Sequence, residues 1–175
     1  TVMGAESTGK TTLSKALSEA LTGWWIPEWA RGYLEQLDDK TVTSEKMEII
    51  FRAQTALQRS AQQLVGMPFL FQDTDLFATI GYYEMWSGTK WNPSYTNVAQ
   101  SLKSDLYIIT HSNIPFETDP LRYGGDKRET SDQYWIDLCI REKLNYWVMP
   151  SSAVDPTLQL DLAFGEVMNL SRDTY

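Results

Sequence analysis

The chain begins with a segment whose residue types and spacing suit phosphate chemistry. Residues 4–11 read Gly-Ala-Glu-Ser-Thr-Gly-Lys-Thr and fill every fixed position of the pattern G-x-x-x-x-G-K-[ST]. Phosphates need backbone N–H groups that converge from a tight turn, and Gly4 and Gly9 allow backbone angles or approach distances that a side chain would block. Lys10 then reaches the β- and γ-phosphates, and the Thr11 hydroxyl ligates Mg²⁺. The segment therefore predicts a site for ATP or GTP with Mg²⁺.

The expected nucleotide contacts extend beyond the two glycines. The whole loop faces the phosphates, and the helix that follows adds its positive N-terminal end. A weaker signal is the turn after the last expected strand, where kinases with this loop often seat the base of the nucleotide. These two segments supply Gly4, Ala5, Glu6, Ser7, Thr8, Gly9, Lys10, Thr11 and Thr12, and then Ser151 and Ser152.

Length and composition predict one globular domain, residues 1–175, without a membrane or nucleic-acid partner. The 175 residues, 13% of them aromatic, suit a single domain. No apolar run approaches the roughly 20 residues needed to cross a bilayer, and a formal charge of −8 argues against a general nucleic-acid partner. The one cysteine, Cys139, is expected in the core, and the cytoplasm is the expected location. Because only Thr1, Val2 and Met3 precede the loop, we expect a domain excised from a longer protein.

Apolar periodicity predicts helices and strands that alternate along the chain, as in a parallel sheet covered by helices. Helical spacing covers residues 10–21, 44–65 and 158–170, and Ser44 is able to cap the second of these helices. Compact apolar runs predict buried strands at residues 24–26, 67–72, 105–110 and 145–149, after a first strand at the chain start. With the phosphate-binding loop, these segments predict an α/β P-loop NTPase fold. The expected sheet is parallel and five-stranded, in the order 2-3-1-4-5, flanked by helices and with a short lid.

Acidic residues follow two of the expected strands. Ligands sit beyond the carboxyl ends of strands in open parallel sheets, so these positions favour function. Glu28 follows the second strand, and Asp73 and Asp75 follow the third. Asp73 is expected to hold the Mg²⁺ shell, through water. Asp75 has an alternative role, because an acid at this position also caps a helix that starts at residue 76.

A polar, glycine-containing stretch at residues 119–128 follows the fourth expected strand. It carries Arg122, Lys127 and Arg128 in an otherwise acidic chain. Cations on a moving segment stabilise the charge that spreads over a transferring phosphoryl group, so the stretch predicts a lid. The alternative is a solvated surface loop.

Four segments together resemble the ribosylnicotinamide kinase domain of the NadR type, the C-terminal half of bifunctional bacterial NAD-salvage proteins. They are residues 4–11 with Glu6 inside the loop, Glu-Trp-Ala-Arg at 28–31, Phe-Gln-Asp-Thr-Asp at 71–75, and Asp-Pro-Leu-Arg at 119–122. The resemblance covers most of the chain. Gly32 departs from it, since the family often has an acid there.

The resemblance implies a kinase that uses ATP and Mg²⁺ to phosphorylate the 5′-hydroxyl of nicotinamide riboside, giving nicotinamide mononucleotide. It also implies a fused or partner nucleotidyltransferase domain upstream. The expected catalytic residues are Lys10, Glu28, Asp73, Arg122 and Arg128, with Thr11 and Asp73 at the metal. The expected substrate-binding residues are Glu28, Trp29, Arg31, Asp73, Asp75, Tyr82 and Trp86. Spacing leaves open whether Glu28 or Asp73 is the base.

Two alternatives share the loop and the strand ends. One is a different small-molecule P-loop kinase that acts on a nucleoside or a nucleotide, which would need another acceptor pocket. The other is a non-catalytic nucleotide switch that reports ATP to an attached domain. Turnover that depends on the acceptor separates the switch from both kinases.

Overall fold

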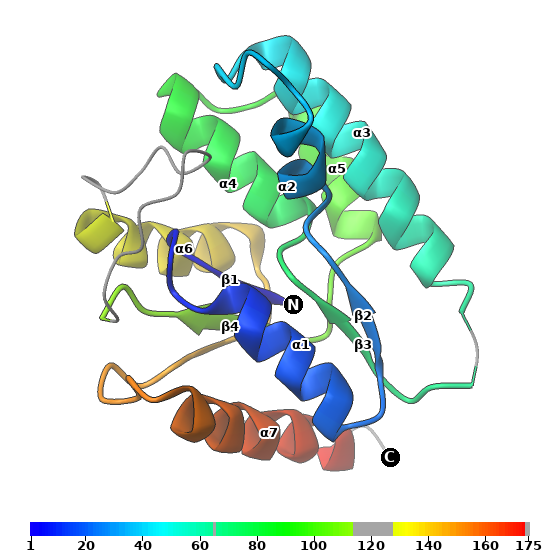
Figure 1. The fold of residues 1–175 in the computed structure, drawn as a ribbon, viewed down its shortest axis with the longest axis vertical. Helices are drawn as coiled ribbons and strands as arrows, with labels where there is room; N and C mark the ends of the chain where they lie inside the picture. The colour runs from blue at the N-terminus through cyan, green and yellow to red at the C-terminus, as the bar shows by residue number, and fades with distance from the viewer. Residues whose placement is uncertain (65, 114–127, 174–175) are drawn as a thin grey trace.

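The computed structural model describes residues 1–64, 66–113 and 128–173, without the side chains of 128–130 and 173 (Figure 1). The predicted lid at residues 119–128 therefore lies almost wholly outside the described residues. In the part described, no helix is long and apolar enough to cross a bilayer.

Parallel strands form the centre of the fold. Within the described residues they make two sheets, one of three strands in the order β1-β4-β5 and one of two, β2-β3. All pairs are parallel, and β1 pairs Val2 with Ile108 while β2 pairs Trp25 with Phe71. The strands are β1 (Val2–Gly4), β2 (Trp24–Ile26), β3 (Leu70–Gln72), β4 (Tyr107–Thr110) and β5 (Tyr146–Val148).

The expectation of one five-stranded sheet is wrong as a hydrogen-bonded unit. In the described residues β1 and β3 meet only at an isolated bridge between Val2 and Asp73, where the Thr74 N–H donates to the Val2 carbonyl at 3.0 Å. Strands of three residues do form ladders here, β1 with β4 and β2 with β3, so among the described residues the break lies only between β1 and β3. Earlier along β3, the Gln72 side chain donates to the hydroxyls of Thr1 and Ser104.

Helices occupy the remaining length, and most lie where apolar spacing predicts them. They are α1 (Lys10–Ala20), α2 (Trp29–Glu35), α3 (Ser44–Ala61), α4 (Leu76–Ser87), α5 (Pro93–Ser101), α6 (Arg128–Glu142) and α7 (Pro156–Asp173). The α3 helix ends four residues before the predicted end, and Thr43 rather than Ser44 is its cap, because the Thr43 hydroxyl accepts from the Lys46 N–H at 3.2 Å.

Two helices were missed. The α2 helix has only seven residues and none is fully buried, although Trp29, Ala30, Tyr33 and Leu34 pack against the core, so its apolar face is short. The α5 helix does have a local signal, since Asn92 caps it and Pro93 is its first residue.

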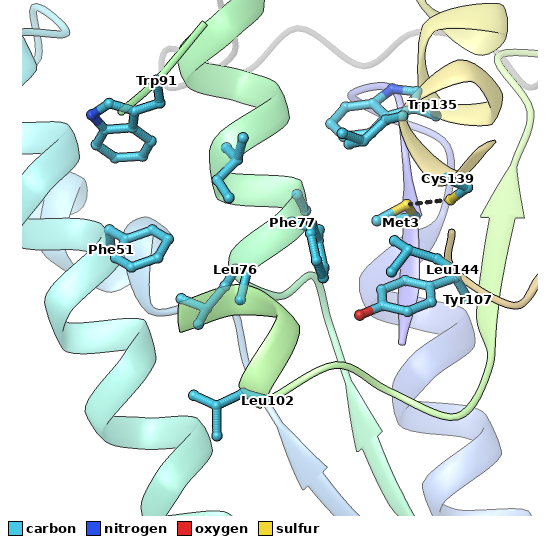
Figure 2. Packing of buried hydrophobic residues seen from close by; sticks show 14 of the residues in the cluster. Met3, Phe51, Leu76, Phe77, Trp91, Leu102, Tyr107, Trp135, Cys139 and Leu144 are labelled. Carbon is cyan, nitrogen blue, oxygen red and sulfur yellow. Dashed lines mark hydrogen bonds between the residues drawn. The ribbon is translucent and has the colours of Figure 1, made fainter. Parts of the chain in front are cut away.

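The helices cover both faces of the strands (Figure 1). Alternate strand residues point to opposite sides. Val2 and Ile108 pack in a cluster with α1 and α7, whereas Met3 and Ile109 pack in a larger cluster with helices α3 to α6. Figure 2 shows part of the larger cluster, where Cys139 donates to the Met3 sulfur at 3.8 Å. The core position predicted for Cys139 is confirmed, and burial raises the pKa of its thiol to about 12.

Helices α4 and α6 pack closely at a glycine. A Cβ at Gly81 would lie 2.7 Å from the Trp135 ring and 3.2 Å from Leu138. Trp135 is fully buried, so its ring has no room to retreat. The missing side chain of Gly81 therefore sets how near α6 lies to α4, the helix that also carries Tyr82 and Trp86.

We expect Gly81→Ala to lower the free energy of unfolding by about 1–3 kcal/mol, the usual cost of overpacking a core. The matched control is Gly165→Ala in α7, where an added Cβ would meet no described atom within 4 Å beyond its chain neighbours and the backbone of its own helix. This variant should be more stable than the wild type by roughly 0.5–1 kcal/mol, because alanine favours a helix interior. Urea unfolding measures both, and a fully stable Gly81→Ala variant would contradict the packing argument.

Candidate active site

The phosphate-binding loop joins β1 to α1, and its two glycines are required by the backbone. Gly4 has a φ of 146°, and a Cβ there would meet the Thr110 hydroxyl oxygen at 2.5 Å. Gly9 has a φ of 80° and is the N-cap of α1, which no described side chain caps. The first N–H groups of α1 therefore face the loop, in the arrangement that binds anions at helix N-termini.

Hydrogen bonds from neighbouring side chains hold the phosphate-binding loop in its shape. The buried Thr8 hydroxyl donates to the Ala5 carbonyl at 2.8 Å and lies 2.6 Å from the Thr110 hydroxyl. Lys10 Nζ donates to the same carbonyl at 2.6 Å, which holds the ammonium over the loop. Tyr82, from α4, donates to the Gly4 carbonyl at 3.1 Å. The loop is thus ordered by contacts with β4 and α4 as well as by its own sequence.

Thr11 and Asp73 form the contact that suits a magnesium ion. The Thr11 hydroxyl donates to Asp73 Oδ2 at 2.5 Å, and the other carboxylate oxygen, Oδ1, is buried with no hydrogen-bond partner among the described residues. Mg²⁺ takes oxygen ligands and is often bound by one or two protein groups together with water and phosphate oxygens. The pair fits such an ion. In the described segments no three His, Cys, Asp or Glu side chains gather into a metal site of their own.

A cavity of about 430 Å³ extends from the loop between the helices. Glu28 and Arg31 line it beside the loop. The α2, α3 and α4 helices then enclose an apolar part, which we call the apolar chamber and which is lined by Ala30, Leu34, Val42, Met47, Ile50 and Trp86. Val154, Pro156 and Gln159, around the start of α7, line another part. In Figure 1 the β1–α1 loop lies between these two groups of elements. The volume suits a small ligand.

Two carboxyl groups near the loop have raised pKa values. Exclusion of water is the main cause of the raised pKa at Glu28; Lys10 and Arg31 oppose it, and the negative charges of Asp73 and Glu6 add to it. Burial also raises the pKa of Asp73, against the Thr11 hydrogen bond and the charges of Lys10 and Arg31. The site therefore holds two carboxyl groups that ionise less readily than free ones, Glu28 and Asp73, next to the cations Lys10 and Arg31.

Many of the residues expected at the site line the cavity. They are Glu6, Ser7, Thr8, Gly9, Lys10, Thr11, Thr12, Glu28, Arg31, Tyr82 and Trp86. Asp73 reaches the same place through Thr11, and Gly4 and Ala5 form the base of the loop. Arg122 lies outside the described residues, and Arg128 is the first residue of α6, with a side chain that is not described.

Four expected residues are placed elsewhere. The Trp29 ring stacks on Tyr33 at 4.9 Å and does not line this cavity. Asp75 is buried and caps α4, accepting from the Ala78 N–H at 3.0 Å and from the Tyr107 hydroxyl at 2.8 Å. Both oxygens of Asp75 are thus used by the fold. Ser151 and Ser152 are exposed in a turn and are not among the lining residues.

Sequence reasoning missed the contribution of α3 to the cavity. Met47, Ile50 and Gln54 line it from the buried face of that helix. A signal was present, because Gln54 and Gln58 are polar residues on an otherwise apolar stripe. Val154, Pro156 and Gln159 follow the serine turn and had no such signal.

The comparisons agree with this architecture. The chain matches the family described as "AAA domain" over residues 1–155, and a search of curated proteins gave no match. Among solved structures it is similar to a "NadR protein in complex with NR", with a TM-score of 0.75 and 20% sequence identity. That match covers 97% of this chain and 49% of the other, so the chain spans about half of that protein. The resemblance to NadR is confirmed as a likeness of fold.

The family match spans most of the chain and includes the loop that suits nucleotide phosphates, the Thr11–Asp73 pair and the helices of the apolar chamber. The geometry of the loop between β1 and α1, with N–H groups at the start of a helix, supports nucleotide binding independently of the family match. The chain belongs to the AAA domain family.

Proposed function

We propose that the protein is a kinase that transfers the γ-phosphoryl group of ATP to the 5′-hydroxyl of nicotinamide riboside. The observation that carries the proposal is the cavity of about 430 Å³, in which a phosphate-binding loop and a half-buried carboxyl, Glu28, adjoin an apolar chamber. A switch domain needs no such chamber. The fold likeness to a NadR protein in complex with NR favours this acceptor over other nucleosides.

The transfer step is an in-line displacement. The acceptor oxygen forms a bond to the γ-phosphorus, the bond from that phosphorus to the bridging oxygen of ADP breaks, and the hydroxyl proton passes to a base. Glu28 suits the base, because its raised pKa favours taking a proton and because Asp73 is engaged with Thr11. Lys10 neutralises charge on the transferring group. When bound, Mg²⁺ held by Thr11 and Asp73 adds further charge neutralisation.

The ring of nicotinamide riboside is a cationic pyridinium, and the cavity offers it suitable partners. The aromatic residues Tyr82 and Trp86 line the cavity, and Glu28 supplies a nearby negative charge. Cations are attracted to aromatic faces by about 0.5–2 kcal/mol per contact. Arg122 and Arg128, as lid cations over the phosphates, remain a prediction from the sequence.

The acceptor assignment predicts that the wild-type protein converts nicotinamide riboside and Mg-ATP into nicotinamide mononucleotide, detected by mass. The analogue with a reduced, neutral ring should have a kcat/KM lower by about fivefold to thirtyfold, which corresponds to roughly 1–2 kcal/mol of lost cation–π attraction. Lys10→Ala should abolish turnover and so exclude a contaminating kinase. Equal or better use of uridine, thymidine or the neutral analogue would overturn the pyridinium assignment.

Asp73→Asn should lower kcat by about 10²-fold and raise the Mg²⁺ concentration needed for half-maximal activity. The amide keeps an acceptor for the Thr11 hydroxyl but loses the negative charge that suits the metal. Asp161→Asn is the matched control, since Asp161 is an exposed acid of α7, and we expect it to change neither quantity. Wild-type magnesium dependence in Asp73→Asn would remove Asp73 from the metal site.

Glu28→Gln should lower kcat by about 10²-fold and yet raise the thermal midpoint at pH 7. A carboxyl with a raised folded pKa contributes stability below its unfolded pKa, and that stability is lost as the pH rises through the folded pKa. Ionised Glu28 is therefore destabilising at neutral pH, and the gain from the amide should shrink toward pH 4.5, the ordinary value for the group. Glu19→Gln, at an exposed acid of α1, should change neither quantity. A Glu28→Gln variant less stable than the wild type at pH 7 would contradict the role of desolvation.

A further inference from the structure

Gln54 is a buried amide in the wall of the cavity. The residue is 2% exposed and lies on the buried face of α3, one turn after Ile50 of the apolar chamber. Its Oε1 accepts a hydrogen bond from the Trp29 backbone N–H at 3.1 Å. Only the oxygen end of a side-chain amide accepts a hydrogen bond, so this contact fixes which end of the amide is Nε2.

The Nε2 end of Gln54 has no hydrogen-bond acceptor in the part of the chain that the structure describes. A buried donor without a partner costs about 1–3 kcal/mol, and folded proteins hold few such groups. The neighbouring lining from the same helix face, Met47 and Ile50, offers no oxygen from its side chains. A ligand that brings an oxygen to this wall would satisfy the donor.

We propose that Gln54 is a specificity-determining residue whose Nε2 donates a hydrogen bond to a carbonyl oxygen on the ring of the acceptor substrate. The inference rests on the proposed function and refines it. The apolar chamber alone accepts any flat ring of suitable size, whereas a buried amide donor favours a ring with a carboxamide or another carbonyl group. Sites built to hydrogen-bond a substrate group reject the analogue that lacks the group.

Gln58 provides the competing explanation. Its Oε1 is also buried without a described partner, and it lies four residues after Gln54 on the same helix face. Side chains four apart on a helix are neighbours, so a change of rotamer would let the two amides pair with each other. The donor would then serve the fold alone. Gln58 does not line the cavity, which makes it the matched control.

The test measures kcat/KM for two acceptors, nicotinamide riboside and the riboside of unsubstituted pyridine. Both are pyridinium cations joined to ribose, and only the first carries the carboxamide. The wild type should prefer nicotinamide riboside by about fivefold to tenfold, the value of one hydrogen bond. Gln54→Met should reduce the preference to near one by slowing only the first acceptor. Gln58→Met should keep the wild-type preference.

A second variant keeps the test decisive if the Gln54→Met protein does not fold. Gln54→Glu keeps an oxygen for the Trp29 N–H but has no amide donor, so it should lose the preference too. Equal losses for both acceptors in the Gln54 variants, or loss of the preference in Gln58→Met, would overturn the assignment to Gln54. Wild-type turnover of nicotinamide riboside without any preference would overturn this inference alone, and no turnover of it at all would overturn the proposed function as well.

Discussion

The structure depends on Asp73, the residue at which the two sheets meet. In the described residues, its backbone makes the only bridge between β1 and β3, and its N–H donates to the Ile26 carbonyl of β2 at 2.9 Å. Its side chain accepts from Thr11 in the first turn of α1. One residue thus joins β1, β2 and α1. The position of the loop relative to Glu28, two residues after β2, is therefore set by the residue whose carboxylate we propose for the metal.

This junction has an electrostatic cost. The pKa values of Asp73 and Glu28 are both raised because the fold removes water from their carboxyl groups. Each ionised carboxylate destabilises the folded chain at neutral pH relative to an amide of the same shape. Lys10 and Arg31 reduce this cost only in part. Carboxyl groups with raised pKa values cluster at functional sites. The destabilisation by ionised Asp73 and Glu28 is therefore a physical reason to assign these two acids to a functional site rather than to the core.

The sequence predicted the parts that rest on local rules. The phosphate-binding loop could be predicted because it requires certain residue types at fixed spacing, here Gly4, Gly9, Lys10 and Thr11. The main strands and helices could be predicted from apolar periodicity. The division into two sheets could not be predicted, because it depends on whether β1 and β3 lie close enough in three dimensions to form a ladder. Asp75 was ambiguous for a physical reason, since one carboxylate after a strand serves a cap and a ligand equally well.

The apolar chamber is the part of the cavity that sequence patterns describe least. Backbone N–H groups hold phosphates, so a short motif is enough to reveal that end. The chamber between α2, α3 and α4 is instead built from single side chains on separate helices, such as Leu34 and Ile50, with no common spacing along the chain. Its one clear mark in the sequence is the pair of amides on an apolar stripe, Gln54 and Gln58, because burying a polar group costs free energy unless it forms hydrogen bonds. The loop of this fold can therefore be read from a motif, whereas the chamber depends on packing among helices.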